Sequence, residues 1–255
     1  MAASVPAHRA PDAAPDGMSE GRRAVAGTEE TERRVRVELR WFAAGEVPVE
    51  VDAWLDGLGR DRIDLRVDHY AVVEAAGHSV KFRGGRRPRF EVKAWRADPV
   101  EVDLGDGVVG TAEWWGKERR GAAPGSRDLP RTGVPLWAPV AKVRRRVPGA
   151  EVVALRLGAP VDVLPGTPAS VGGPDAAPWW SVAVELPGTS SPLAVRRRAA
   201  ELLAGFPMPS ILHAGASHSY ASWLIEQFAA GHVGPAGSEA AAGIEPAYAA
   251  LQAAT

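Results

Sequence analysis

The fold of this 255-residue chain is decided by the stretch Arg34-Val35-Arg36-Val37-Glu38-Leu39-Arg40-Trp41, in which charged and apolar residues alternate without a break. Alternation with a period of two is typical of a half-buried β-strand, because successive side chains point to opposite sides. The charged face carries Arg36, Glu38 and Arg40, and no apolar residue interrupts it. The stretch therefore predicts a strand with one apolar face and one wholly charged face.

The same alternation returns along the chain. It predicts further strands over residues 62–75, 78–83, 88–95, 109–119, 136–147, 150–157 and 179–186. The turn-prone pairs Gly84-Gly85 and Asp106-Gly107 separate neighbouring strands, which indicates hairpins and an antiparallel sheet. Apolar residues at helical spacing predict three helices, over residues 48–58, 192–205 and 219–230. The expected fold class is mainly β, of the α+β type, with flanking helices.

Composition suggests one domain with loose ends. We expect a disordered tail over residues 1–30, a single domain over 31–230, and an Ala-rich extension over 231–255. The chain has no cysteine, which excludes disulfides and thiolate metal sites. Its first residues lack the apolar core of a signal peptide, and no run approaches the ~18 apolar residues of a membrane span. A cytoplasmic protein without a membrane partner is therefore expected.

Positive charge gathers in the middle of the chain. The formal net charge is −1, which argues against a general nucleic-acid partner. Between Gly77 and Arg146, however, 16 Lys and Arg residues face 8 Asp and Glu residues, a local excess of eight positive charges. We expect a small anionic ligand to bind in this part of the protein.

Charged residues two positions apart lie on the same side of a strand. Such pairs recur at Glu38/Arg40, Asp68/Tyr70, Lys81/Arg83, Glu91/Lys93, Lys117/Arg119 and Lys142/Arg144/Arg146. Two architectures fit this pattern. One is a sandwich whose charged face is solvated, and the other is a barrel whose charged face lines a wet interior. A lumen of Lys and Arg would suit a phosphate chain, and glutamates among them would suit Mg²⁺ or Mn²⁺.

The order of these pieces resembles the CYTH superfamily, the triphosphate tunnel enzymes, which include inorganic triphosphatases, thiamine triphosphatases and one class of adenylate cyclase. The resemblance spans residues 34–224. Its motifs are Glu38-Leu39-Arg40, Lys81-Phe82-Arg83, Glu91-Val92-Lys93, Lys117-Glu118-Arg119, Lys142-Val143-Arg144, a late Glu185 and the closing Ser219-Tyr220-Ala221-Ser222-Trp223-Leu224. One departure is visible, because the family opens with Glu-x-Glu-x-Lys and this chain has Arg36, Glu38 and Arg40 there.

The resemblance implies an eight-stranded antiparallel tunnel that binds a triphosphate together with Mg²⁺ or Mn²⁺, and a metal-assisted triphosphatase-like hydrolase. The cations expected to grip the phosphate chain are Arg40, Lys81, Arg83, Lys93, Lys117, Arg119, Lys142 and Arg144. The candidate metal ligands are Glu38, Glu113 and Glu185. The altered opening motif keeps a second hypothesis open, a non-catalytic binder of polyphosphate or nucleotide. A third hypothesis is an RNA-binding barrel.

Trp114 and Trp115 form one of two tryptophan pairs in the predicted strands. Adjacent strand residues point to opposite faces, so one ring of the pair is expected in the core. Trp115 shares its face with Glu113 and Lys117, which would place it beside the charged cavity. Ser217 or Ser219 is expected to cap the last helix.

Overall fold

The computed structural model describes residues 35–72, 77–83, 89–120, 136–157, 177–188 and 190–232. The predicted tail over 1–30 and all but the first two residues of the predicted extension over 231–255 lie outside this part. The strands are β1 (Val35–Ala44), β2 (Arg62–Val72), β3 (His78–Arg83), β4 (Arg89–Trp95), β5 (Val100–Gly105), β6 (Val108–Arg120), β7 (Leu136–Val147), β8 (Ala150–Leu157) and β9 (Pro178–Pro187). The helices are α2 (Val49–Leu58), α3 (Pro192–Leu203) and α4 (Tyr220–Ala229), with short 3-10 turns η1 (Pro209–Ile211) and η2 (Ala214–Ala216).

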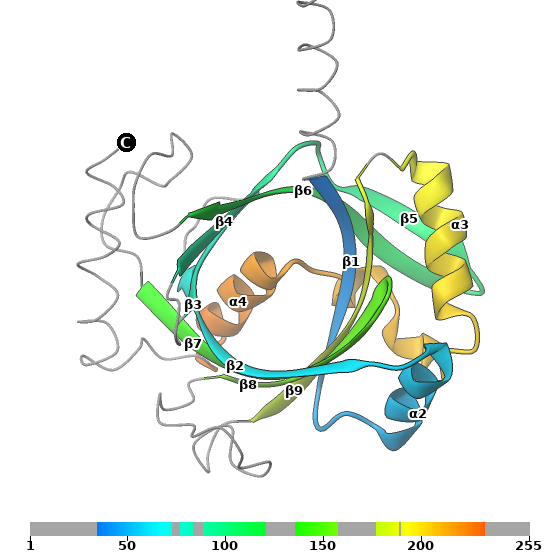
Figure 1. Cartoon of the computed structure of the whole chain (residues 1–255), viewed down its shortest axis with the longest axis horizontal. Helices are drawn as coiled ribbons and strands as arrows, with labels where there is room; N and C mark the ends of the chain where they lie inside the picture. Colours follow the sequence, from blue (N-terminus) through cyan, green and yellow to red (C-terminus); the bar gives the residue numbers. More distant parts are fainter. Residues whose placement is uncertain are drawn as a thin grey trace, which may run out of the picture.

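Eight of these strands close into an antiparallel barrel (Figure 1). Their order around the wall is β1-β9-β8-β7-β2-β3-β4-β6, and pairing of β1 with β6 completes the ring. The ninth strand, β5, pairs only with the first half of β6 and extends the wall to one side. The predicted eight-stranded antiparallel barrel is confirmed, and the alternative of a sandwich is excluded.

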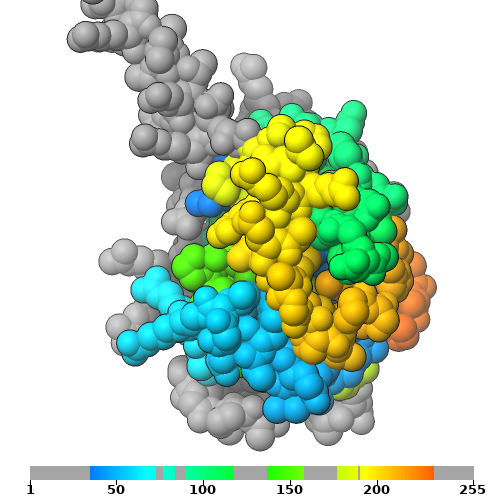
Figure 2. Space-filling view, turned by 90° about the vertical axis from the view of Figure 1, so that its right-hand side faces the viewer, coloured from blue at the N-terminus to red at the C-terminus, as the bar shows by residue number. Residues whose placement is uncertain are grey.

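The main apolar core lies on the outside of the barrel wall. The outward residues of β1, Val37, Leu39 and Trp41, are fully buried against the apolar side of α2, which contributes Val51 and Leu55. Helix α3 covers the neighbouring part of the wall through its own buried residues. Figure 2 shows α3 and the segment after it running across this face between α2 and the β5–β6 hairpin. The charged faces of the strands are left pointing inward.

One end of the barrel is closed by α4, which lies within the ring in Figure 1. Trp223 stacks on Phe42 of β1 with their ring centroids 4.3 Å apart, and Tyr220 stacks on Tyr70 of β2 at 5.4 Å. The side chain of Ser219 caps the helix by accepting a bond from the backbone N–H of Ser222, as predicted. The inward faces of the strands are thus apolar where they meet α4 and charged toward the other end.

Predicted and observed elements agree in type, with ends that differ by a few residues. Residues 73–75 of the strand predicted over 62–75 lie outside the described residues, and α3 ends at Leu203 rather than at residue 205. Strand β5 was not predicted, although its residues Val100, Val102 and Leu104 alternate with charged ones. No helix in the described part of the chain is both long and apolar enough to span a membrane.

Candidate functional site: a charged lumen

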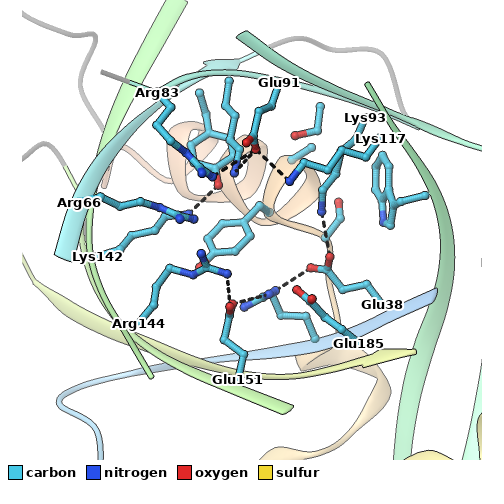
Figure 3. A pocket seen from close by; sticks show the side chains of 18 of the residues that line it. Glu38, Arg66, Arg83, Glu91, Lys93, Lys117, Lys142, Arg144, Glu151 and Glu185 are labelled. Atoms are coloured by element: carbon cyan, nitrogen blue, oxygen red, sulfur yellow. Dashed lines mark hydrogen bonds and ion pairs between the residues drawn. The ribbon is translucent and has the colours of Figure 1, made fainter. Parts of the chain in front are cut away.

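The lumen of the barrel contains a cavity of about 230 Å³. Nine cationic and five acidic side chains line it, an excess of four positive charges, and they come from all eight strands of the ring. Figure 3 shows these side chains converging from the wall, with α4 behind them. Tyr220 and Ala221 of α4 line the same cavity and form its floor.

The structure brings most of the predicted cations together. The ones that line the cavity are Arg40, Lys81, Arg83, Lys93, Lys117, Lys142 and Arg144. Arg119 lies in β6 opposite Glu91, but its side chain is outside the described residues. Trp115 also lines the cavity, while Trp114 packs against the outer core, so the prediction of one ring on each face is confirmed.

Two buried carboxylates, Asp68 and Glu91, hold a group of cations on one side of the lumen. The Nζ atoms of Lys81 and Lys142 each lie 3.4 Å from Oδ2 of Asp68. Oε2 of Glu91 lies 3.1 Å from Lys81 Nζ and 3.2 Å from Lys117 Nζ. Burial alone would raise the pKa of Asp68, but Lys81 and Lys142 hold it well below its usual range. Burial lowers the pKa of Lys81 to about 8 despite both acids.

On the opposite side, Glu151 of β8 and Arg40 of β1 anchor a second network. Oε1 of Glu151 accepts from Nη2 of Arg40 at 2.9 Å, and Oε2 accepts from Arg144. Arg40 donates through Nε to Glu38 at 2.8 Å and through Nη1 to Ser181 at 2.9 Å. Burial alone would raise the pKa of Glu151, and the two guanidinium groups lower it. Every group of this network is at most 9% exposed, so these charges are balanced almost without water.

The three predicted metal ligands form a row across adjacent strands. Glu38 of β1 is the direct register partner of Glu113 in β6 and of Glu185 in β9. Direct partners in an antiparallel sheet have Cβ atoms about 5 Å apart and project from the same face. Burial and the neighbouring Glu38 charge raise the pKa of Glu113 to about 7, and Trp115 Nε1 donates to its Oε2 at 2.9 Å.

The three glutamates lie side by side on adjacent strands, and their carboxylate oxygens are the ligands that Mg²⁺ and Mn²⁺ prefer. The side chains themselves do not converge. Glu38 accepts from Arg40 at Oε1 and from Lys93 at Oε2, each within 2.9 Å. Within the described ranges, no group of three or more His, Asp or Glu residues is arranged to hold a metal ion. A cation could be held here only if Glu38 gave up at least one of these bonds.

At the floor of the cavity, Lys142 meets two tyrosines. Its Nζ donates to the hydroxyl of Tyr70 at 2.6 Å and lies 3.6 Å from the ring centroid of Tyr220. The guanidinium of Arg40 lies over the same Tyr220 ring at 4.6 Å. Lys142 is 1% exposed, and burial lowers its pKa well below the usual value for lysine. The aromatic faces help hold cationic groups that few water molecules can reach.

Several lumen residues were absent from the predicted site. The alternation over residues 62–75 placed Asp64 and Arg66 of β2 on one face with Asp68 and Tyr70, but neither was assigned a role. Arg146 was noted in the sequence on the face of Arg144 but not assigned a role. Glu151 and Tyr220 were also not assigned to the site. Glu151 is the only acid of β8, and Tyr220 was noted only within the closing motif of residues 219–224. The closed ring brings both into the lumen.

No family model and no curated protein matches the chain. Among solved structures, it is similar to the mimivirus capping enzyme triphosphatase, with 8% identity and a TM-score of 0.43 over 76% of this chain and 99% of that one. It is similar to an RNA triphosphatase of Schizosaccharomyces pombe, with 7% identity and a TM-score of 0.34 over 80% of this chain and 100% of that one. It is also similar to a chain of the Schizosaccharomyces pombe Mediator head module, with 9% identity and a TM-score of 0.34 over 68% of this chain and 96% of that one.

Similarity at these values does not identify an activity. What the chain itself shows is a closed eight-stranded antiparallel barrel with a charged lumen, which is the tunnel fold that the resemblance to the CYTH superfamily implied. The fold that this resemblance implied is therefore present in the chain.

Proposed function

We propose that the lumen binds a triphosphate or a similar phosphorylated small molecule and that the protein is a metal-assisted phosphohydrolase. The observation that carries this proposal is the excess of cations over acids in an enclosed cavity that α4 closes at one end. Arg offers a planar fork and Lys a compact point charge, the two donors best suited to phosphate oxygens. A polyanion would replace carboxylates as the partner of several cations at once.

Different lumen residues would bind phosphate groups at different depths of the cavity. Lys81 and Lys117 meet at Glu91 and would turn toward a phosphate group that enters from the open end. Arg40 and Lys142 would hold the deepest group near Tyr220. Hydrolysis on such a scaffold depends mostly on positioning and on neutralising charge that develops in the transition state. Burial of these donors keeps water from weakening them.

Glu38, Glu113 and Glu185 are the residues that would hold Mg²⁺ or Mn²⁺. A bound divalent cation would bridge phosphate oxygens and neutralise their charge. Glu113 contributes support from this chain, because burial and the charge of Glu38 raise its pKa to about 7, and a bound cation would favour its charged form. Its partners in the row would supply the remaining oxygens.

A second candidate is a binding protein without catalysis, and one feature favours it. Both oxygens of Glu38 are engaged by Arg40 and Lys93, and the family's first glutamate position is occupied by Arg36, which is exposed. In that case the same lumen binds a triphosphate and releases no phosphate. The two candidates share a ligand and differ only in turnover.

The test measures phosphate release from tripolyphosphate, thiamine triphosphate and ATP, with and without Mg²⁺ or Mn²⁺, beside thermal shifts for the same ligands. Lys117→Gln is the probe, because Lys117 lines the cavity and is half-exposed, and Arg197→Gln on α3 is the matched control. Loss of one charge-assisted contact should weaken binding about tenfold. Metal-dependent release that falls only in Lys117→Gln supports the enzyme, stabilisation without release supports the binder, and neither signal refutes both.

A further inference from the structure

The open end of the barrel carries two arginines, Arg60 and Arg62, that do not line the lumen cavity, beside Arg146, which does. Arg62 begins β2, and Arg146 near the end of β7 is its direct register partner. Arg60 lies two residues before Arg62. Together with the turn that joins β7 to β8, these side chains line a second cavity of about 300 Å³, which shares Arg146, Glu151 and Glu185 with the lumen cavity.

The carboxylate that lies opposite Arg146 in the sheet is bonded to two other arginines. Its direct register partner in β8 is Glu151, whose oxygens accept from Arg40 and Arg144. Nε of Arg146 is buried and has no hydrogen-bond partner. A buried guanidinium N–H without an acceptor costs free energy unless a ligand supplies one.

Arg62 is exposed, and the carboxylates near it in the sequence are engaged by other arginines. Asp64, the nearest carboxylate on its own strand face, accepts from Arg66 at 2.7 Å and lies 3.4 Å from Arg144 Nη1. Asp61 accepts from Arg145 instead. Across the part of the chain that the structure describes, neither Arg60 nor Arg62 forms an ion pair.

The arrangement is unfavourable without a ligand. Like charges directly opposite each other in an antiparallel pair are destabilising, and Arg62 and Arg146 are such a pair. In the lumen, by contrast, carboxylates balance most cations. Glu151 of β8 and Glu185 of β9 also line the cavity at the open end, and the charge of Glu151 is already offset by its two arginines. A single oxyanion between the arginines would satisfy them.

We propose that Arg60, Arg62 and Arg146 form a second oxyanion site, at the open end of the barrel and next to the lumen cavity, that binds one phosphate group. The group comes from free orthophosphate or from a phosphate chain whose remainder lies in the lumen. Arginine forks match both, because each offers the same tetrahedral set of oxygens. The inference goes beyond the proposed hydrolase, since it holds whether or not the lumen catalyses anything.

The test compares Arg60→Gln/Arg62→Gln with the control Arg196→Gln/Arg197→Gln, which removes the same charge from exposed arginines of α3. Calorimetric titrations use the full chain with chelator at about 0.1 M ionic strength, where surface charges are partly screened. Orthophosphate is titrated alone and with saturating tripolyphosphate, and a longer linear polyphosphate is compared with tripolyphosphate. Two lost charge-assisted contacts should weaken the affected affinity at least about tenfold.

Orthophosphate binding that persists beside tripolyphosphate and falls only in Arg60→Gln/Arg62→Gln identifies free phosphate as the ligand. If the longer polyphosphate binds more tightly than tripolyphosphate, and this difference disappears only in Arg60→Gln/Arg62→Gln, the ligand is a phosphate chain that continues from the lumen. If both variants behave like the unaltered protein in both arms, the proposal is wrong. Absence of tripolyphosphate binding, with the orthophosphate response intact, would overturn the proposed lumen function and leave this site standing.

Discussion

Replacing Glu151 by Gln should cost the protein about 3 kcal/mol of unfolding free energy. Glu151 is 2% exposed and accepts from both Arg40 and Arg144, which are themselves buried. Breaking a buried ion pair by removing one partner typically costs about 3–5 kcal/mol, because a charge is left uncompensated. Gln keeps one acceptor oxygen, so the lower end of this range applies. In a domain of about 200 residues this corresponds to a fall in Tm of roughly 6–12 °C.

Urea unfolding followed by tryptophan fluorescence measures this loss, with Glu201→Gln on the exposed side of α3 as the control at no more than about 0.5 kcal/mol. Tripolyphosphate should then stabilise Glu151→Gln more than the unaltered protein, because its oxygens can replace the missing carboxylate beside Arg40. A ligand at a hundred times its Kd adds about 2.7 kcal/mol. If Glu151→Gln is as stable as the control, the lumen does not depend on internal charge balance and the reasoning fails.

Three further changes test other parts of the structure. The folded pKa of Glu113 lies at about 7, above its unfolded value near 4.5. The stability that this carboxyl group contributes is therefore complete below pH 4.5 and should fall by about 3 kcal/mol as pH rises through 7. Chemical unfolding in the presence of a chelator should show a smaller fall in Glu113→Gln. Ser219→Ala removes the cap of α4 and should cost about 1 kcal/mol in the same assay. A Cβ on Gly110 would lie 2.4 Å from Cζ2 of the buried Trp41, so Gly110→Ala should cost about 2 kcal/mol, whereas Gly57→Ala in α2 meets nothing and should gain up to about 1 kcal/mol; equal effects of the two alanines would contradict the packing described.

Alternation in the sequence was enough to predict the strands of the barrel and the inward parity of its charges. It could not decide whether the charged face of β1 points into a lumen or into solvent, because a sandwich obeys the same period. The decision depends on pairing between β1 and β6, whose partners Glu38 and Glu113 are 75 positions apart. Such contacts leave no local trace in the chain.

Most of the site was predicted from charges that repeat on one strand, although Asp64, Arg66 and Arg146 also repeat and were not assigned to it. The single acid Glu151 was missed. Lys142 and Arg144 belong to a repeating pair, and both line the cavity. Glu151 is the only acid of β8 and enters the lumen at its open end because β8 pairs with β7 and β9. Glu151 accepts hydrogen bonds from Arg40 and Arg144 rather than from Arg146, and strand register alone does not determine which arginines it contacts.

Stability and binding are carried by different faces of the same strands. The apolar residues that drive folding pack outside the wall under α2 and α3, and inside it only against α4. Charges near the open end, such as Lys117, are partly hydrated, so substitutions there should alter binding with little loss of stability. Charges near the floor, such as Lys142, are nearly dry, and their removal must change both. Effects on binding and on stability should therefore separate where a lumen charge is partly hydrated, as at Lys117, and coincide where it is nearly dry, as at Lys142 and Glu151.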